Sequence, residues 1–239
     1  MENRDPQDLH AQLTWKMHYV TDEENESTTK TGELWYTKAK PVAKFLIRFD
    51  EKREGTRADK LDERYLFDGQ WYVRLDSRTK IVERRELRKA NDPGDPYKLG
   101  RGPFPVPFGQ KKADIVREFD VTLVPPGKGD PADTDHLKLV PRVGTQIADT
   151  YRQLDFWIAR EGPLDGFPLK VLAAKLKGTG QLDSYITTEF TGAQLNTGLK
   201  AELFEIKTPT GYHEDMERLE DISEPTEKAA TPGKAPGAP

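Results

Sequence analysis

The sequence contains no cysteine. Disulfide bonds, thiolate metal sites and a cysteine nucleophile are therefore excluded. No apolar run approaches the ~18 residues that a membrane-spanning helix needs. The sequence also lacks a P-loop, a G-x-S-x-G elbow and a G-x-G-x-x-G turn after a strand. Nucleotide binding and serine-hydrolase chemistry therefore have no recognisable motif in this chain.

Histidine is scarce and scattered. The four histidines are His10, His18, His136 and His213. None has a histidine or acidic partner at metal-ligand spacing, so we interpret them as surface or loop residues and expect neither a metal site nor a cofactor. Adjacent acids such as Asp62 and Glu63 point to opposite faces of a strand, and so do not act together on one bond. An enzyme is therefore possible only through an arrangement of residues that their spacing in the sequence does not show.

Charge is abundant but mixed in sign. Charged residues make up 33% of the chain and the net charge is -4, which argues against nucleic acid as a partner. The first ten residues, MENRDPQDLH, lack the apolar region of a signal peptide. Two alternatives follow: the protein is cytoplasmic, or it is exported and a signal has already been removed.

The clearest local signal is a hairpin. Asp68-Gly69 separates an aromatic run at 65–67 from an alternating run at 71–75. Asp-Gly between alternating apolar residues is a strong hairpin signal, because glycine accepts the positive φ of a tight turn. This stretch therefore predicts antiparallel sheet.

Alternation of apolar and polar residues recurs along the chain and predicts about eleven strands in mostly up-and-down order. We expect them within 13–19, 31–40, 44–50, 65–67, 71–75, 81–87, 121–126, 136–141, 154–158, 169–173, 185–190 and 199–206. Short helices are expected within 5–12, 111–119 and 144–151. The predicted fold class is mainly β with a few short helices.

The predicted domain organisation has three parts. Residues 1–12 form a short helix or the remnant of a leader, and residues 13–213 form the β domain. Residues 214–239 are acidic and then rich in proline, alanine and glycine, a composition that buries too little surface to order itself.

The apolar positions of the expected strands form stripes that would line a concave interior if the sheet curls. These candidate ligand-binding residues are Trp15, Met17, Tyr19, Phe45, Ile47, Phe49, Tyr65, Phe67, Trp71, Val73, Leu75, Leu154, Phe156 and Ile158. An ordinary hydrophobic core explains the same pattern, because small barrels and sandwiches fill their interiors with such side chains. The alternative is a hollow interior that holds an apolar ligand.

Three stretches, in order, resemble the bacterial outer membrane lipoprotein carrier family of the LolA and LolB type. They are TGELWYTKAKP at 31–41, YLFDGQWYVRLDSRTKIVE at 65–83 and SYITTEFTGAQLNTGLKAELFEIKTPTGYH at 184–213. The first is similar to the family's Gly-x-Leu strand with a basic-Pro corner, the second to its Asp-Gly segment, and the third to its closing strands. The resemblance spans most of residues 13–213.

The resemblance implies an unclosed, LolA-like antiparallel barrel with a helix and loop lid over an apolar cavity. The lid would lie within 89–119, and its apolar residues would be Phe104, Val106, Phe108, Ile115, Val116 and Phe119. Lys40 occupies the basic position before the corner proline, where the family typically has arginine. The chain departs from the family in its shorter first helix and its proline-rich lid.

The function implied is that of a non-enzymatic, exported carrier in the periplasm. Its ligands would be lipid or lipoprotein acyl chains, and its partners membrane-bound donor and acceptor proteins. We expect a monomer. A periplasmic interaction or sensor module that binds a peptide or protein with the same half-barrel is the second hypothesis. An enzyme acting on a lipid or glycan is the third.

Overall fold

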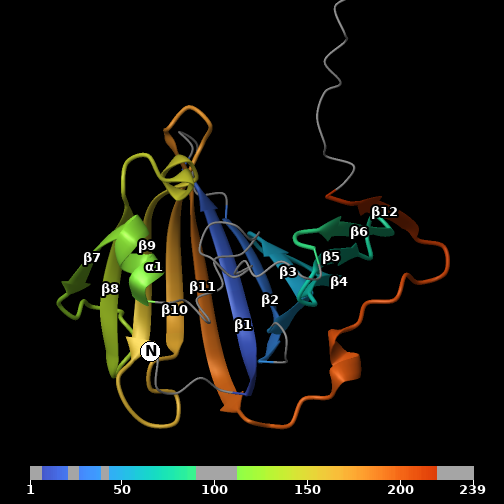
Figure 1. Cartoon of the computed structure of the whole chain (residues 1–239), viewed down its shortest axis with the longest axis horizontal. Coiled ribbons are helices and arrows are strands. Elements are labelled where there is room, and N and C mark those ends of the chain that lie inside the picture. The colour runs from blue at the N-terminus through green and yellow to red at the C-terminus, as the bar shows by residue number, and fades with distance from the viewer. Residues whose placement is uncertain (1–6, 21–26, 39–42, 90–111, 220–239) are drawn as a thin grey trace, which may run out of the picture.

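The computed structural model describes residues 7–20, 27–38, 43–89 and 112–219. These residues form one twelve-stranded sheet, one short α-helix and two 3-10 helices (Figure 1). The strands are β1 (Asp8–Tyr19), β2 (Ser27–Thr37), β3 (Lys44–Glu54), β4 (Arg57–Phe67), β5 (Trp71–Asp76), β6 (Ile81–Glu86), β7 (Phe119–Val124), β8 (Thr134–Pro141), β9 (Tyr151–Ala159), β10 (Pro168–Leu176), β11 (Leu182–Leu195) and β12 (His213–Glu217). The helices are α1 (Lys112–Glu118), η1 (Gln146–Asp149) and η2 (Ala201–Phe204).

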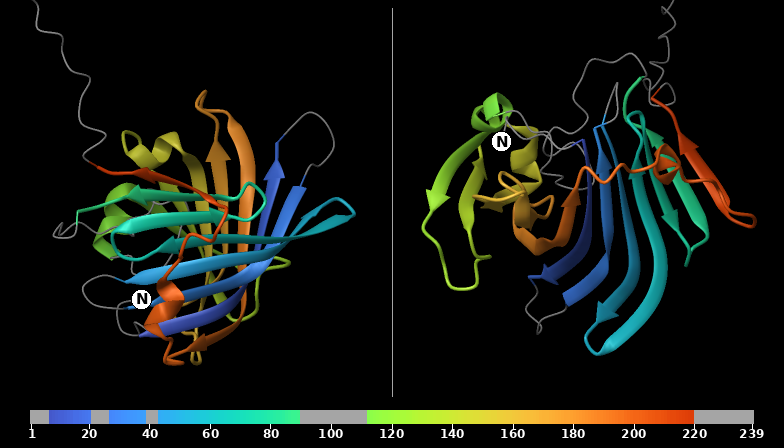
Figure 2. Two further views of the ribbon diagram at one scale, coloured as in Figure 1. Left: turned by 90° about the vertical axis from the view of Figure 1, so that its right-hand side faces the viewer. Right: turned by 90° about the horizontal axis from the view of Figure 1, so that it is seen from below.

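The sheet is built outward from β1. Its strand order is β12-β6-β5-β4-β3-β2-β1-β11-β10-β9-β8-β7, so β1 pairs with β2 on one side and with β11 on the other. All neighbours are antiparallel except β12 and β6, which are parallel. The sheet curls, but its edge strands β12 and β7 do not pair with each other (Figures 1 and 2). The predicted mainly β, unclosed antiparallel sheet is therefore confirmed.

The first strand begins earlier than predicted. β1 starts at Asp8, so the expected helix within 5–12 is wrong for the described residues of that range. The physical reason is that Leu9 and Ala11 continue the period-two stripe of Leu13 and are both 0% exposed. Burial on a strand face outweighs the local helix signal of the preceding Asp-Pro pair.

The concave face carries the main hydrophobic core, which we call the inner cluster. It draws on both halves of the sheet: Leu13 of β1 and Phe49 of β3 belong to it, as do Phe156 of β9 and Phe190 of β11. Ile115 of α1 packs against the cluster as well. Much of the concave face is therefore filled by the protein's own side chains.

A second core, which we call the outer cluster, lies on the opposite face of β3 to β6. Trp71, Val73 and Leu75 pack in it, so the prediction that they share one stripe with Phe67 is wrong. Leu66, which precedes Phe67 in β4, is the residue of that strand that belongs to the outer cluster.

The turn between β4 and β5 explains the change of face. Phe67 pairs with Tyr72, so the preceding residue Trp71, which begins β5, faces away from the side that Phe67 faces. The Asp68 carboxylate accepts hydrogen bonds from the backbone N–H groups of Gln70 (3.0 Å) and Trp71 (2.8 Å). Asp68 therefore shapes the bend, and the length of the connection sets which face β5 presents.

The outer cluster is covered by residues 197–212, which we call the strap. Its Phe204 and Ile206 are buried there beside β3 to β6, and Figure 2 shows the strap in orange crossing the blue and cyan strands. The predicted strand at 199–206 is wrong, because this segment contains η2 and pairs with no strand. The residues expected to begin a disordered tail at 214 instead form part of β12.

Candidate functional site

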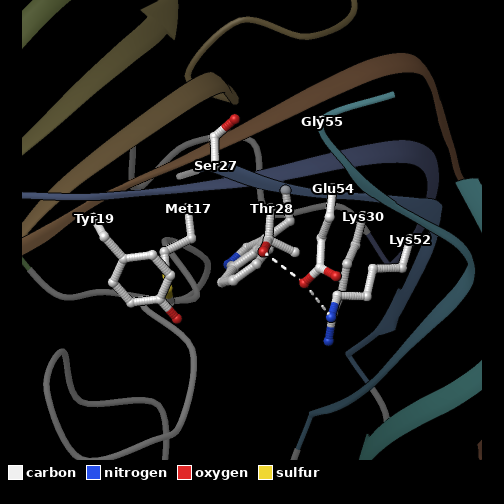
Figure 3. A pocket seen from close by; sticks show the side chains of 9 residues that line it. Met17, Tyr19, Ser27, Thr28, Lys30, Lys52, Glu54 and Gly55 are labelled. Atoms are coloured by element: carbon white, nitrogen blue, oxygen red, sulfur yellow. Dashed lines mark hydrogen bonds and ion pairs between the residues drawn. The ribbon is translucent and has the colours of Figure 1, made fainter. Parts of the chain in front are cut away.

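A cavity of about 640 Å³ opens at the end of the concave face formed by β1, β2 and β3. Side chains from the three strands and the turns beside them surround it (Figure 3). It is lined by Trp15, Met17, Tyr19, Ser27, Thr28, Lys30, Lys52, Glu54 and Gly55.

Strand register gives the cavity one apolar wall and one polar wall. Alternate positions of β1 supply Trp15, Met17 and Tyr19, which point to the same face. Trp15 lies opposite Lys30 of β2, and Lys30 lies opposite Lys52 of β3. The cavity is therefore amphipathic, with aromatic and thioether groups facing amines and a carboxylate.

Lys30 has the least exposed side chain among the charged residues of the lining. Its ammonium forms an ion pair with Glu63 of β4, and only 6% of the Glu63 surface is exposed. The same nitrogen lies 5.7 Å from the centre of the Trp15 ring and 5.5 Å from that of Phe49. Pairing with Glu63 and contact with two ring faces offset the cost of holding a cation beside the core.

Glu63 belongs to a wider network on β4 and β5. It accepts a hydrogen bond from the Tyr65 hydroxyl and lies 3.4 Å from Nη2 of Arg74. Arg74 also reaches Asp76 (3.2 Å) and Glu83 (3.4 Å). Burial, together with the Glu63 carboxylate, raises the pKa of Tyr65, so its phenol remains a neutral donor.

The outer part of the polar wall is an ion pair between a half-buried lysine and an exposed glutamate. The Lys52 ammonium contacts the Glu54 carboxylate, which also accepts a hydrogen bond from Thr28 Oγ1 (3.3 Å). The bond from Lys52 lowers the pKa of Glu54, against a smaller opposing effect of burial. The Glu54 carboxylate therefore stays ionised at neutral pH beside the cavity mouth.

The structure divides the predicted binding residues among three places. Trp15, Met17 and Tyr19 line the cavity. Buried members of the inner cluster are Phe45, Ile47, Phe49, Phe67, Leu154, Phe156 and Ile158, with Tyr65 packed against it. Trp71, Val73 and Leu75 lie in the outer cluster, on the other face of the sheet.

The predicted lid is described only in part. Phe104, Val106, Phe108 and the corner residue Lys40 lie outside the described residues. Ile115 packs against the inner cluster and Phe119 is buried within it. Val116 faces solvent, with 48% of its surface exposed.

The polar wall was missed from the sequence. The expected strands left 20–30 and 51–64 outside the sheet, whereas β2 begins at Ser27 and β3 and β4 meet at a tight turn around Gly55. The available signal was alternation: Thr28 and Lys30, and Lys52 and Glu54, repeat at period two. Charged side chains on one face of long strands resemble a solvated loop unless this period is followed.

The fold gives His136 acidic neighbours that sequence spacing did not show. Its Nε2 lies 2.9 Å from Oδ1 of Asp155, and its Nδ1 lies 3.9 Å from Oδ2 of Asp130. The imidazole stacks on Trp157 at 4.3 Å between ring centres. This cluster joins the β7–β8 loop to β9, and in the described part of the chain no group of metal-ligating residues could hold an ion.

Within the described ranges, no helix has both the length and the apolar character required to cross a bilayer.

No protein-family model matches the chain, and no curated protein matches its sequence. Solved structures show a distant likeness. A LolA superfamily protein from Nitrosomonas europaea aligns over 86% of this chain and 93% of its own, at 12% identity and a TM-score of 0.39. A candidate outer membrane lipoprotein-sorting protein domain from Vibrio parahaemolyticus aligns over 83% of this chain and 89% of its own chain, at 16% identity and a TM-score of 0.38. A chain of the MucA/MucB complex of Pseudomonas aeruginosa aligns over 83% of this chain and 56% of its own length, at 14% identity and a TM-score of 0.35.

Proposed function

We propose that this protein is a non-enzymatic carrier that binds lipid or lipoprotein acyl chains at the mouth of its half-barrel. The observation that carries the proposal is the amphipathic cavity of about 640 Å³ beside the inner cluster. Its volume lies within the ~300–1,000 Å³ range of small-molecule sites. The sequence resemblance to lipoprotein carriers supports an exported, periplasmic location, with membrane-bound donor and acceptor proteins as partners.

The two walls suit the two ends of an amphiphile. An acyl chain laid along Trp15, Met17 and Tyr19 leaves water, and each buried methylene contributes about 0.8 kcal/mol. A polar head group at the same time meets the Lys52 and Glu54 pair, so it keeps hydrogen-bonding partners. Binding of this kind needs an apolar wall and a polar wall, and it needs no catalytic residue.

Met17→Asp is expected to weaken uptake of a fluorescent fatty-acyl probe about tenfold. The new carboxylate lies on the apolar wall, where it raises the cost of bringing methylenes beside it. Uptake is measured by titrating the probe and recording its fluorescence, and thermal melting of each variant verifies that the fold persists.

Val140→Asp is the matched control, because Val140 is exposed on β8, far from the cavity in the strand order. Its uptake should equal that of the original chain. Native mass spectrometry for co-purified lipid supplies a readout independent of the probe. Absence of lipid and of uptake in the intact protein would refute the carrier proposal.

A second candidate is a periplasmic interaction or sensor module that binds a peptide or protein. The filled inner cluster favours it, because the side chains of both sheet halves occupy the concave face beyond the cavity. This candidate predicts an intact, folded protein that takes up no acyl probe. The same titration therefore separates the two functions.

A further inference from the structure

The two edge strands of the described sheet, β12 and β7, differ in their side chains. β12, which pairs with β6 over five residues from His213 to Glu217, carries three acidic residues there, and charged side chains discourage a further strand. At the other end of the sheet, no strand in the described part of the chain pairs with the outer side of β7. Among the described residues β7 therefore has an open strand edge, which is a template for pairing with another strand.

The hydrogen bonding of β7 shows which backbone groups face outward. The Arg142 N–H donates to the Glu118 carbonyl (2.9 Å), which makes 118 and 142 a hydrogen-bonded pair. Such pairs alternate in an antiparallel ladder, so Asp120 and Thr122 bond to β8. Phe119 and Val121 then direct their N–H and C=O groups away from β8, as does Leu123. The pairing of Phe119 with Pro141, which has no N–H, agrees with this phase.

The side chains of β7 do little to block a second strand. Val121 and Leu123 are 41% and 64% exposed, and they share a face with buried Phe119. β7 contains no lysine and no proline, and its register with β8 shows no bulge. Lysine, proline and bulges ordinarily prevent sheet edges from associating, and β7 has none of them.

We propose that β7 pairs antiparallel with β7 of a second copy of this chain, with Val121 opposite Val121. This register places Phe119 opposite Leu123 and uses the outward-facing groups of Val121 and Leu123 and the carbonyl of Phe119, whose N–H is the last donor of α1. On the other face it sets Asp120 opposite Thr122, whose hydroxyl donates to the carboxylate, so the two Asp120 carboxylates do not oppose each other. The strand is therefore self-complementary in both charge and apolar pattern.

The pairing forms a weak dimer, which departs from the monomer expected from the sequence. A single pair of six-residue strands buries less surface than the ~1,000 Å² of a stable interface. The association therefore depends on concentration. It lies outside the cavity, since β7 and β1 to β3 are in different halves of the sheet.

Disulfide trapping tests the register, because the chain contains no cysteine and an introduced one is unique. Residues opposite each other in a hydrogen-bonded pair have Cα atoms ~5.5 Å apart, within the range of a disulfide. Val121→Cys is therefore expected to form a covalent dimer under mild oxidation. Leu123→Cys is the matched control: in this register the Cα atoms at position 123 of the two copies are offset by four residues, or about 13 Å along the strands.

The expected result is that Val121→Cys is trapped at least tenfold faster than Leu123→Cys, although Leu123 is the more exposed residue. Random collisions would give the opposite order. Sedimentation of the cysteine-free chain at rising concentration should show mass increasing toward a dimer, and Val121→Lys should abolish the increase. Equal trapping of the two cysteine variants, or a constant monomer mass, would overturn the proposal and leave the edge to a different partner.

Discussion

Gly32→Ala is expected to lower the free energy of unfolding by about 3 kcal/mol. Gly32 lies in β2 where the β2–β3 register shifts, opposite Phe49. A Cβ atom there would lie 1.8 Å from the backbone oxygen of Arg48 and 2.8 Å from the Cα of Phe49. Because both contacts are with backbone, a side-chain rotation does not relieve them. Two central strands must move apart, which disturbs the inner cluster on one face.

Urea denaturation followed by tryptophan fluorescence measures this loss. Gly178→Ala is the matched control, since a Cβ at Gly178 meets no atom within 4 Å. Its free energy of unfolding should change by less than ~0.5 kcal/mol. If Gly32→Ala is as stable as Gly178→Ala, then β2 and β3 do not approach as closely as the structure shows.

Asp8→Ala is expected to cost about 2–3 kcal/mol of stability. The Asp8 carboxylate accepts hydrogen bonds from Thr197 N (2.6 Å), Thr197 Oγ1 (2.9 Å), Gly198 N (2.8 Å) and Leu199 N (3.3 Å). Asp8 is buried, so removing it leaves these donors without their acceptor at the start of the strap. The strap should then detach from the outer face more readily, and limited proteolysis should cleave it sooner.

The Asp8 anchor also makes stability depend on pH. Burial alone would raise the pKa of Asp8, but the hydrogen bonds from Thr197, Gly198 and Leu199 outweigh it and hold the pKa below the ordinary 3.8. A carboxyl group with a lowered pKa in the folded state stabilises the protein fully above its unfolded pKa. That contribution is lost as the pH falls through the lowered, folded value.

The stability difference between the original chain and Asp8→Ala should therefore be constant near neutral pH and shrink on acidification below about pH 4. Chemical denaturation at a series of pH values measures it. Asp50→Ala, which removes an exposed carboxylate from β3, is the control, and its loss of stability at neutral pH should be small. A difference for Asp8→Ala that grows as the pH falls would contradict the hydrogen-bonded anchor.

The alternation of β1, β3 and β9 predicted which side chains meet. Leu13, Phe49 and Phe156 come from distant parts of the chain, yet each lies on the apolar side of its strand and packs in the inner cluster. Such stripes are readable from sequence because one strand face must be buried. For the same reason the apolar stripe of Trp15, Met17 and Tyr19 along one face of β1 was readable from the sequence.

The phase of β5 was not readable in this way, because its two faces are both rich in large side chains. Val73 faces the outer cluster and Tyr72 faces the opposite side, so polarity alone does not choose between them. The choice depends on how many residues the Asp68 turn spans, which the Asp-Gly signal does not specify. The strap was missed for a related reason: Phe204 and Ile206 are buried by tertiary contact without joining any ladder.

The pairing of β1 with β11 has a consequence for the order of folding. The central seam of the sheet joins residues nearly a chain length apart, as in the hydrogen bond from Gln7 to Asn196, 189 residues away. Contacts of such long range slow folding, because a large loop must close before they form. During synthesis, one edge of β1 therefore stays unpaired until β11 has left the ribosome. Until then β1 to β6 form a half-sheet with an apolar face and an unpaired edge at β1. The protein is most prone to aggregation during this interval.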